Sequence, residues 1–170
     1  IQAKTHVNQF NSIGGVEASV KLGALSVDHL EEMKEEDFVS LENAECMPTI
    51  LPSCSFFLGI PYGPATKMIE RGLPVALATD YNPGSSPSGN MNLVASLGCT
   101  QMKMTPEQVI NATTINTAYA MGVEKELGSI CVGKKANLFI TKEIPSYSYL
   151  SYSFGENLIN KVIINGKIIA

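Results

Sequence analysis

Short apolar runs alternate with helix-compatible stretches along the first half of the chain. Each run is bounded by polar residues or by Gly and Pro, which is typical of strands buried on both faces of a parallel sheet. The expected strands are 1–7, 25–27, 47–51 and 74–78, and the expected helices between them are 16–22, 31–43 and 65–71. Strands that alternate with helices indicate parallel βαβ units, so the pattern predicts an α/β fold.

The pattern changes in the second half of the chain. Residues 93–104 favour a helix, and a second helix is expected from Pro106 to Thr113, with Thr105 as its N-cap and Gln108 completing a capping box. A further helical turn is expected at 118–121, and the segments 128–130, 133–140 and 161–169 are β-like. Asn165-Gly166 between two apolar runs predicts a two-residue hairpin. We therefore expect two domains, 1–127 and 128–170.

A polar or ionisable residue lies at the carboxyl end of each expected parallel strand: His6, His29, Ser53 and Asp80. In a (β/α) barrel, the carboxyl ends of the strands line the mouth where chemistry takes place. His6 and His29 are the two histidines of the chain, and both occupy this position. The alternative is that each histidine is a hydrogen-bonded structural residue and that Asp80 caps a turn.

The composition excludes some partners. The chain has a net charge of -4, which argues against nucleic acid because no basic surface is available for phosphates. No apolar run is long enough for a membrane span, so no membrane partner is expected. The four cysteines form no CxxC pair, which favours reduced thiols in a cytoplasmic protein. The chain opens on Ile1 without an element before His6, and we expect a fragment of a longer protein.

Several motifs resemble the amidohydrolase superfamily and, within it, the imidazolonepropionase family of histidine degradation. They are Thr5-His6-Val7-Asn8-Gln9, Ser26-Val27-Asp28-His29-Leu30 and Asp80-Tyr81-Asn82-Pro83-Gly84-Ser85-Ser86-Pro87, together with Lys103–Glu107, Ile115–Ala120 and the tail from Gly128. The resemblance implies the carboxyl-terminal half of a TIM-type (β/α)8 metal-dependent hydrolase barrel, strands five to eight, plus part of a small β-sandwich domain.

The resemblance also implies roles for individual residues. His6 and Asp80 would be metal ligands, and His29 and Asp80 would be catalytic. The substrate would be bound by Gln9, Asn82, Gly84 and Ser85. The implied reaction is hydrolysis of a cyclic amide C–N bond, which converts 4-imidazolone-5-propanoate and water to N-formimino-L-glutamate.

The implied cofactor is one divalent metal ion. Imidazole and carboxylate ligands suit zinc and also iron, so the residue types leave both open. Relatives supply two further ligands from a His-x-His motif, which this chain lacks. We therefore expect weak metal binding and little activity from the chain alone. Because a half barrel leaves sheet edges open, we also expect a homo-oligomer or pairing with an amino-terminal half.

Two alternatives stay open at this point. The first is another amidohydrolase, a cyclic-amide hydrolase or a deaminase, acting on a different small molecule. The second is a non-catalytic half barrel that serves as an assembly module.

Overall fold

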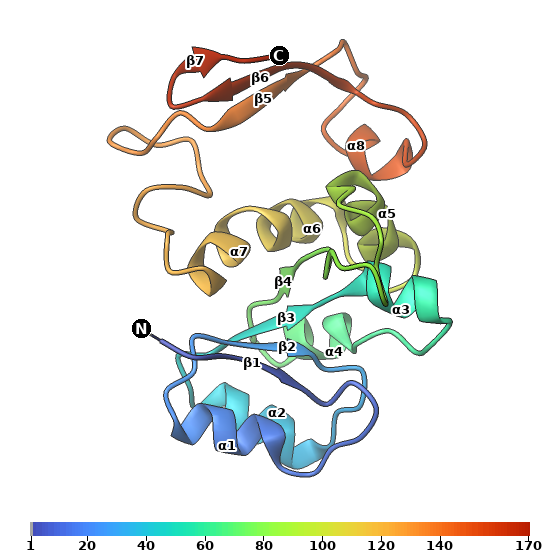
Figure 1. The fold of residues 1–170 in the computed structure, drawn as a ribbon, viewed down its shortest axis with the longest axis vertical. Coiled ribbons are helices and arrows are strands. Elements are labelled where there is room, and N and C mark those ends of the chain that lie inside the picture. Colours follow the sequence, from blue (N-terminus) through green and yellow to red (C-terminus); the bar gives the residue numbers. More distant parts are fainter. Residues whose placement is uncertain (1) are drawn as a thin grey trace.

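The computed structural model describes residues 2–170, and it contains two sheets of opposite character (Figure 1). A four-stranded sheet has the order β1-β2-β3-β4, and its paired strands are all parallel. A three-stranded antiparallel sheet, β5-β6-β7, follows near the carboxyl end. In Figure 1, helices α1 and α2 lie below the parallel sheet, and α6 and α7 lie between the two sheets. The α/β class predicted from the sequence is confirmed.

The first half of the chain alternates strand and helix as the pattern predicts. Its elements are β1 (Lys4–Val7), α1 (Gly15–Lys21), β2 (Ser26–His29), α2 (Glu35–Glu42), β3 (Met47–Ile50), α3 (Pro52–Leu58), α4 (Ala65–Glu70) and β4 (Ala76–Leu77). The part of the first expected strand that falls on Ile1 lies outside the described residues.

The second half contains α5 (Met91–Thr100), α6 (Pro106–Thr113), α7 (Ile115–Ala120), β5 (Leu138–Thr141), α8 (Tyr149–Tyr152), β6 (Ile159–Ile164) and β7 (Lys167–Ile168). The Thr105 capping box is present, since its hydroxyl accepts from Gln108 N and the Gln108 side chain accepts from Thr105 N. The hairpin is also confirmed, because Asn165 and Gly166 both have positive φ, as its tight turn requires.

Several expected boundaries are wrong. Helix α2 begins at Glu35 rather than at residue 31, because His29 and Leu30 adopt left-handed backbone and Asp37 caps the helix by accepting from Lys34 N. Residues 128–130 form no strand, and in the expected strand 133–140 pairing starts only at Leu138. Helices α3 and α8 occupy segments for which no helix was predicted.

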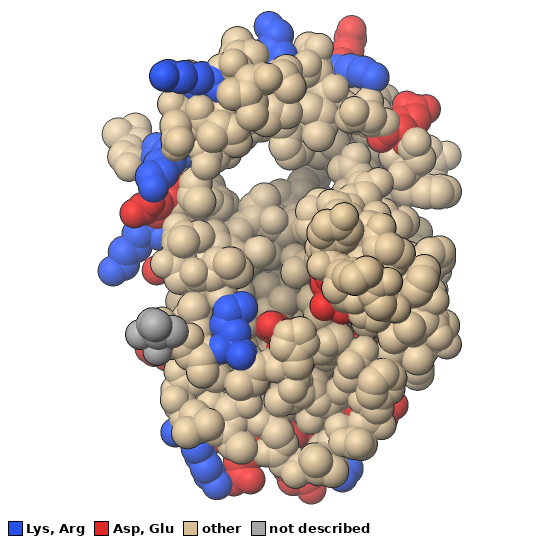
Figure 2. Space-filling model, viewed as in Figure 1, with Lys and Arg blue, Asp and Glu red and all other residues tan. Residues whose placement is uncertain are grey.

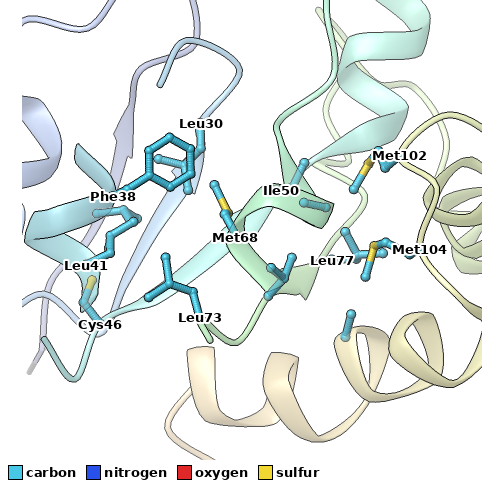
Figure 3. Close-up of a cluster of buried hydrophobic side chains, with 14 of the residues drawn as sticks. Leu30, Phe38, Leu41, Cys46, Ile50, Met68, Leu73, Leu77, Met102 and Met104 are labelled. Carbon is cyan, nitrogen blue, oxygen red and sulfur yellow. The ribbon is translucent and has the colours of Figure 1, made fainter. Parts of the chain in front are cut away.

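The main apolar core lies between the parallel sheet and its helices. Figure 3 shows Met68 of α4 between Phe38 of α2 and Ile50 of β3, with Leu77 and Met104 beyond. These side chains are all 4% exposed or less. Packing of this core therefore determines which face of the sheet contacts the helices. It also holds the strands in the direction in which they run to their carboxyl ends.

The opposite face of the sheet is more polar and leads to the strand ends. Lys4 Nζ donates to Ser26 Oγ at 2.6 Å and to the carbonyl of Ala120 in α7 at 2.9 Å, and Ser26 Oγ donates to Asp28 Oδ1 at 2.8 Å. His6 is in register with Asp28, so it belongs to the same face. This polar row connects α7 to the strand that carries His6.

Two further features bear on the predicted environment. Within residues 2–170, no helix combines the length and the apolar content that crossing a membrane would require. All four cysteines are free: Cys46 and Cys54 are buried, Cys99 is half-buried and Cys131 is exposed.

Candidate functional site

Three ionisable side chains from separate strands meet at the carboxyl edge of the parallel sheet. His6 lies in β1, His29 ends β2, and Asp80 follows β4. His29 Nε2 lies 3.0 Å from His6 Nδ1, and one potential ligand atom from each of the three residues falls within 4.8 Å of the others. We call these three residues the rim cluster. Its members differ in burial, since His29 is buried, Asp80 is half-buried and His6 is exposed.

The backbone around the rim cluster adopts left-handed conformations. The φ angles are 59° at Asn8, 90° at His29, 68° at Leu30 and 53° at Asp80. Such angles are uncommon in residues other than glycine, and they persist only where surrounding contacts hold them. Here Leu30 N donates to Val7 O and Glu32 N donates to Asn8 O at 2.8 Å, which ties the turn after β2 to the end of β1.

The loop after Asp80 is ordered by the side chain of Asn82. Its Oδ1 accepts from the backbone N of Gly84 and of Ser85, both at 2.8 Å, and its Nδ2 donates to Asp80 O at 2.6 Å. Ser85 Oγ in turn donates to Asp80 Oδ2 at 3.2 Å. The loop therefore folds back onto the carboxylate of the rim cluster.

Cys54 connects this carboxylate to Gln9. Gln9 Nε2 donates to Cys54 Sγ at 3.4 Å, and the thiol is fully buried beside Ser85 and Asp80. Burial is the main reason why the pKa of Cys54 is raised to about 11. The hydrogen bond from Ser85 lowers this pKa, whereas the neighbouring Asp80 raises it. The thiol is therefore protonated at neutral pH and is a poor nucleophile.

The predicted site residues fall into three groups. The structure brings His6, His29 and Asp80 together, and Ser85 contacts Asp80 directly. Gln9 lies beside Cys54, whereas Asn82 and Gly84 hydrogen-bond to each other within the loop. Ser53 is buried in the first turn of α3 and donates to Thr79 O at 2.7 Å, so it supports the strand end rather than joining the rim cluster.

Sequence reasoning missed two residues of this region. Cys54 follows an expected strand by three residues, but the helix that turns it inward was not predicted. Glu31 follows His29 by two residues, and its carboxylate Oε1 lies 3.5 Å from His29 Nδ1. The signal available for Glu31 was its closeness in sequence to His29, which alone does not distinguish a contact from a solvated acid.

The donor set of the rim cluster fits a divalent metal ion. Two imidazole nitrogens and one carboxylate oxygen are ligand types that zinc and iron accept, and catalytic zinc sites commonly have three protein ligands. Imidazole and carboxylate groups are also the side chains that most often act as general acids and bases in hydrolysis. The arrangement is therefore suited to metal-assisted hydrolysis.

Comparison with known proteins agrees with this chemistry. The sequence model of the amidohydrolase family matches residues 5–169. An imidazolonepropionase from Flavobacterium johnsoniae is 62% identical over 169 residues, which is 99% of this chain and 41% of that protein. An imidazolonepropionase from Christiangramia forsetii is likewise 62% identical and is matched over the same shares of both chains. The chain thus spans about 41% of the length of these curated relatives.

Solved structures with low sequence identity share the fold. A zinc-bound adenosine deaminase from Xanthomonas campestris superposes with a TM-score of 0.83 at 20% identity, over 99% of this chain and 45% of that one. At this level of identity the likeness concerns the fold alone.

Proposed function

The chain belongs to the amidohydrolase family, and from that premise we propose that it is the carboxyl-terminal part of an imidazolonepropionase. The observation that carries the proposal is the 62% identity to curated imidazolonepropionases over 99% of the chain. The meeting of His6, His29 and Asp80 at one sheet edge supports it independently. The reaction would open the ring of 4-imidazolone-5-propanoate by hydrolysis of an amide C–N bond and give N-formimino-L-glutamate.

We propose that the parallel sheet and its helices are half of a (β/α)8 barrel and that residues 128–170 contribute to a small β domain. Two features support this. The strands are all parallel with helices between them, and the fold matches 45% of the zinc-bound adenosine deaminase. The antiparallel sheet begins at Leu138, after a long segment without strands.

His6 and Asp80 would hold one divalent ion, zinc or iron. The ion would lower the pKa of water toward neutrality and polarise the carbonyl of the ring. The donor set of the rim cluster fits either ion.

The residues of this chain supply the remaining functions. The Asp80 carboxylate would accept the proton of the attacking water, and the hydrogen bond from Ser85 to one of its oxygens supports this role. His29 is buried and adjacent, so it can pass a proton to the leaving nitrogen of the ring. Gln9, Asn82, Gly84 and Ser85 would bind the substrate, with the loop already ordered by the hydrogen bonds of Asn82.

We propose a cytoplasmic location, which the four free cysteines support. We also propose that the chain pairs with an amino-terminal half or with a second copy of itself. The support is that β1 and β4 are the end strands of the four-stranded sheet, and unpaired strands at a sheet edge favour association.

The first test is zinc binding by the purified chain. We expect Asp80→Asn to weaken zinc binding by about tenfold or more, because a metal-ligating carboxylate is replaced by a neutral amide. Glu36→Gln is the matched control, since Glu36 is exposed and away from the rim cluster. Equal zinc affinity in the chain and in Asp80→Asn would contradict the ligand assignment and favour a purely structural module.

The second test is activity in a reconstituted enzyme. The chain is mixed with the amino-terminal segment of the Flavobacterium johnsoniae relative, and ring opening of 4-imidazolone-5-propanoate is followed by the loss of its absorbance. We expect turnover from the mixture and little from either part alone. Formation of a complex that binds zinc but hydrolyses another cyclic amide or deaminates a base would replace the proposed substrate.

A further inference from the structure

The buried carboxylate of Glu31 lies beside the ring of His29, the candidate catalytic histidine. Glu31 Oε1 is 3.5 Å from His29 Nδ1, and the side chains are 1% and 4% exposed. The other ring nitrogen of His29, Nε2, lies 3.0 Å from His6 Nδ1 on the opposite edge of the ring. The imidazole of His29 therefore lies between the Glu31 carboxylate and the ring of His6.

The backbone makes this contact possible at a conformational cost. In a regular strand, side chains two residues apart project side by side from the same face. Here His29 and Leu30 both adopt left-handed φ angles, 90° and 68°, so the regular strand conformation ends before Glu31, whose carboxylate lies against the His29 ring. Two consecutive non-glycine residues in this conformation are costly, and the turn is held by the hydrogen bond from Glu32 N to Asn8 O.

The surroundings of Glu31 point to His29 as its partner. Ser55 Oγ donates to Glu31 Oε1 at 3.1 Å, while Glu31 Oε2 and His29 Nδ1 are buried without a hydrogen-bond partner. Among residues 2–170, His29 is the one side chain able to carry positive charge within salt-bridge distance of Glu31. Burying a carboxylate is unfavourable unless polar partners compensate, and an apolar side chain would fill this space without that cost.

We propose that Glu31 is a positioning residue that fixes the orientation and the tautomer of His29. In a neutral imidazole one nitrogen donates and the other accepts, and an ionised carboxylate only accepts. Glu31 therefore selects the form in which His29 Nδ1 carries the hydrogen. Nε2 is then left with its lone pair facing His6. The inference rests on the proposed function only for the use made of Nε2, which would first take up the proton that Asp80 accepts from water and then pass it to the leaving nitrogen.

Ser55 contributes to the same arrangement. Its hydroxyl donates a hydrogen bond to Glu31 Oε1. Ser55 lies in α3, the helix that also carries Cys54. The carboxylate is thus oriented from one side by α3 and presents its remaining lone pairs to the ring. A carboxylate that accepts from the outer ring nitrogen of a functional histidine commonly sets the orientation and the basicity of the ring.

The test is nitrogen-15 NMR of the histidine rings in the 170-residue chain, at a pH above the range in which histidines ionise. The chain has two histidines, so the spectrum contains two rings, and His6→Asn assigns them. We expect His29 to show a protonated Nδ1 and an unprotonated Nε2. The measurement needs neither metal nor substrate, so its outcome is independent of whether the hydrolase proposal holds.

Three variants separate positioning from simple packing. Glu31→Ala is expected to lower the ratio of the Nδ1–H to the Nε2–H tautomer about tenfold, because it removes the carboxylate that favours a hydrogen on Nδ1. Glu31→Gln should largely preserve the ratio, because the amide oxygen still accepts. Glu32→Gln is the matched control, since the adjacent Glu32 is exposed, and it should change nothing.

The proposal is overturned if His29 is in the Nε2–H form in the unmodified chain, or if Glu31→Ala leaves the tautomer ratio unchanged. If Glu31→Ala does not fold, the unmodified chain and Glu31→Gln still decide, because both must then show the Nδ1–H form.

Discussion

Replacing Gly128 by alanine tests how the chain after α7 is seated on that helix. A Cβ at this position would lie 2.5 Å from Ala118 Cβ, 3.0 Å from Ile115 Cα and 3.1 Å from Thr114 O. Two of these three atoms belong to the backbone of α7 or its N-cap, so they cannot move aside alone. In addition, φ is +87° at Gly128, a conformation that side chains with a Cβ rarely adopt.

The expected magnitude follows from these two costs. The left-handed backbone costs an alanine roughly 1–2 kcal/mol. Forcing a methyl group into a packed contact costs about 1–3 kcal/mol. The lower entropy of the unfolded alanine chain offsets about 0.4–1 kcal/mol. We therefore expect Gly128→Ala to lower the free energy of unfolding by about 1–5 kcal/mol.

Gly133 provides a matched control. Its φ is +93°, but a Cβ there would meet nothing within 4 Å. Gly133→Ala therefore carries the backbone cost without the clash, and we expect a loss of only about 1 kcal/mol. Urea unfolding measures both variants, and amide hydrogen exchange in α7 reports whether the segment detaches locally. Equal losses in the two variants, with unchanged exchange in α7, would refute the packing argument.

Two further predictions concern stability. Burial raises the pKa of Cys46 from 9.0 to about 11, so the folded chain keeps this thiol neutral while the unfolded chain ionises. The contribution of this thiol to the free energy of unfolding should be constant below pH 9 and should fall between pH 9 and 11. In urea unfolding measured across this pH range, Cys46→Ala should show a smaller fall. Thr105→Ala removes the hydroxyl that accepts from Gln108 N, and should cost about 1 kcal/mol. Thr100→Ala is the control, because the Thr100 hydroxyl only donates to Ser96 O within α5, and this variant should lose less stability. Equal losses in the two variants would contradict the assignment of Thr105 as a cap.

The sequence allowed the strands and most helices to be predicted because their signals are local. The Thr105 capping box and the Asn165-Gly166 hairpin depend on a few neighbouring residues, and both are present. The gathering of the two histidines with Asp80 was also predictable, since the carboxyl ends of parallel strands share one edge.

What the sequence did not predict depends on contacts between distant segments. The expected strand at 128–130 has apolar character at Ile130, yet this side chain is 93% exposed and no strand pairs with it. Helix α3 begins at Pro52, and a proline is as typical of a turn as of the start of a helix. Only the packing of α3 turns Cys54 toward Asp80. The contact of Glu31 with His29 requires two left-handed residues that no local preference favours.

Backbone strain is concentrated where the rim cluster forms. Six non-glycine residues in the described part of the chain have positive φ, and four of them, Asn8, His29, Leu30 and Asp80, lie at strand ends beside this cluster. Each such residue costs of order 1–3 kcal/mol, so the fold gives up stability at this edge. The strain orients His29 between Glu31 and His6 and places Asp80 within reach of Ser85. Stability alone gives no reason to gather left-handed residues at this edge, whereas a site that must hold polar side chains in fixed positions before its ligand arrives does.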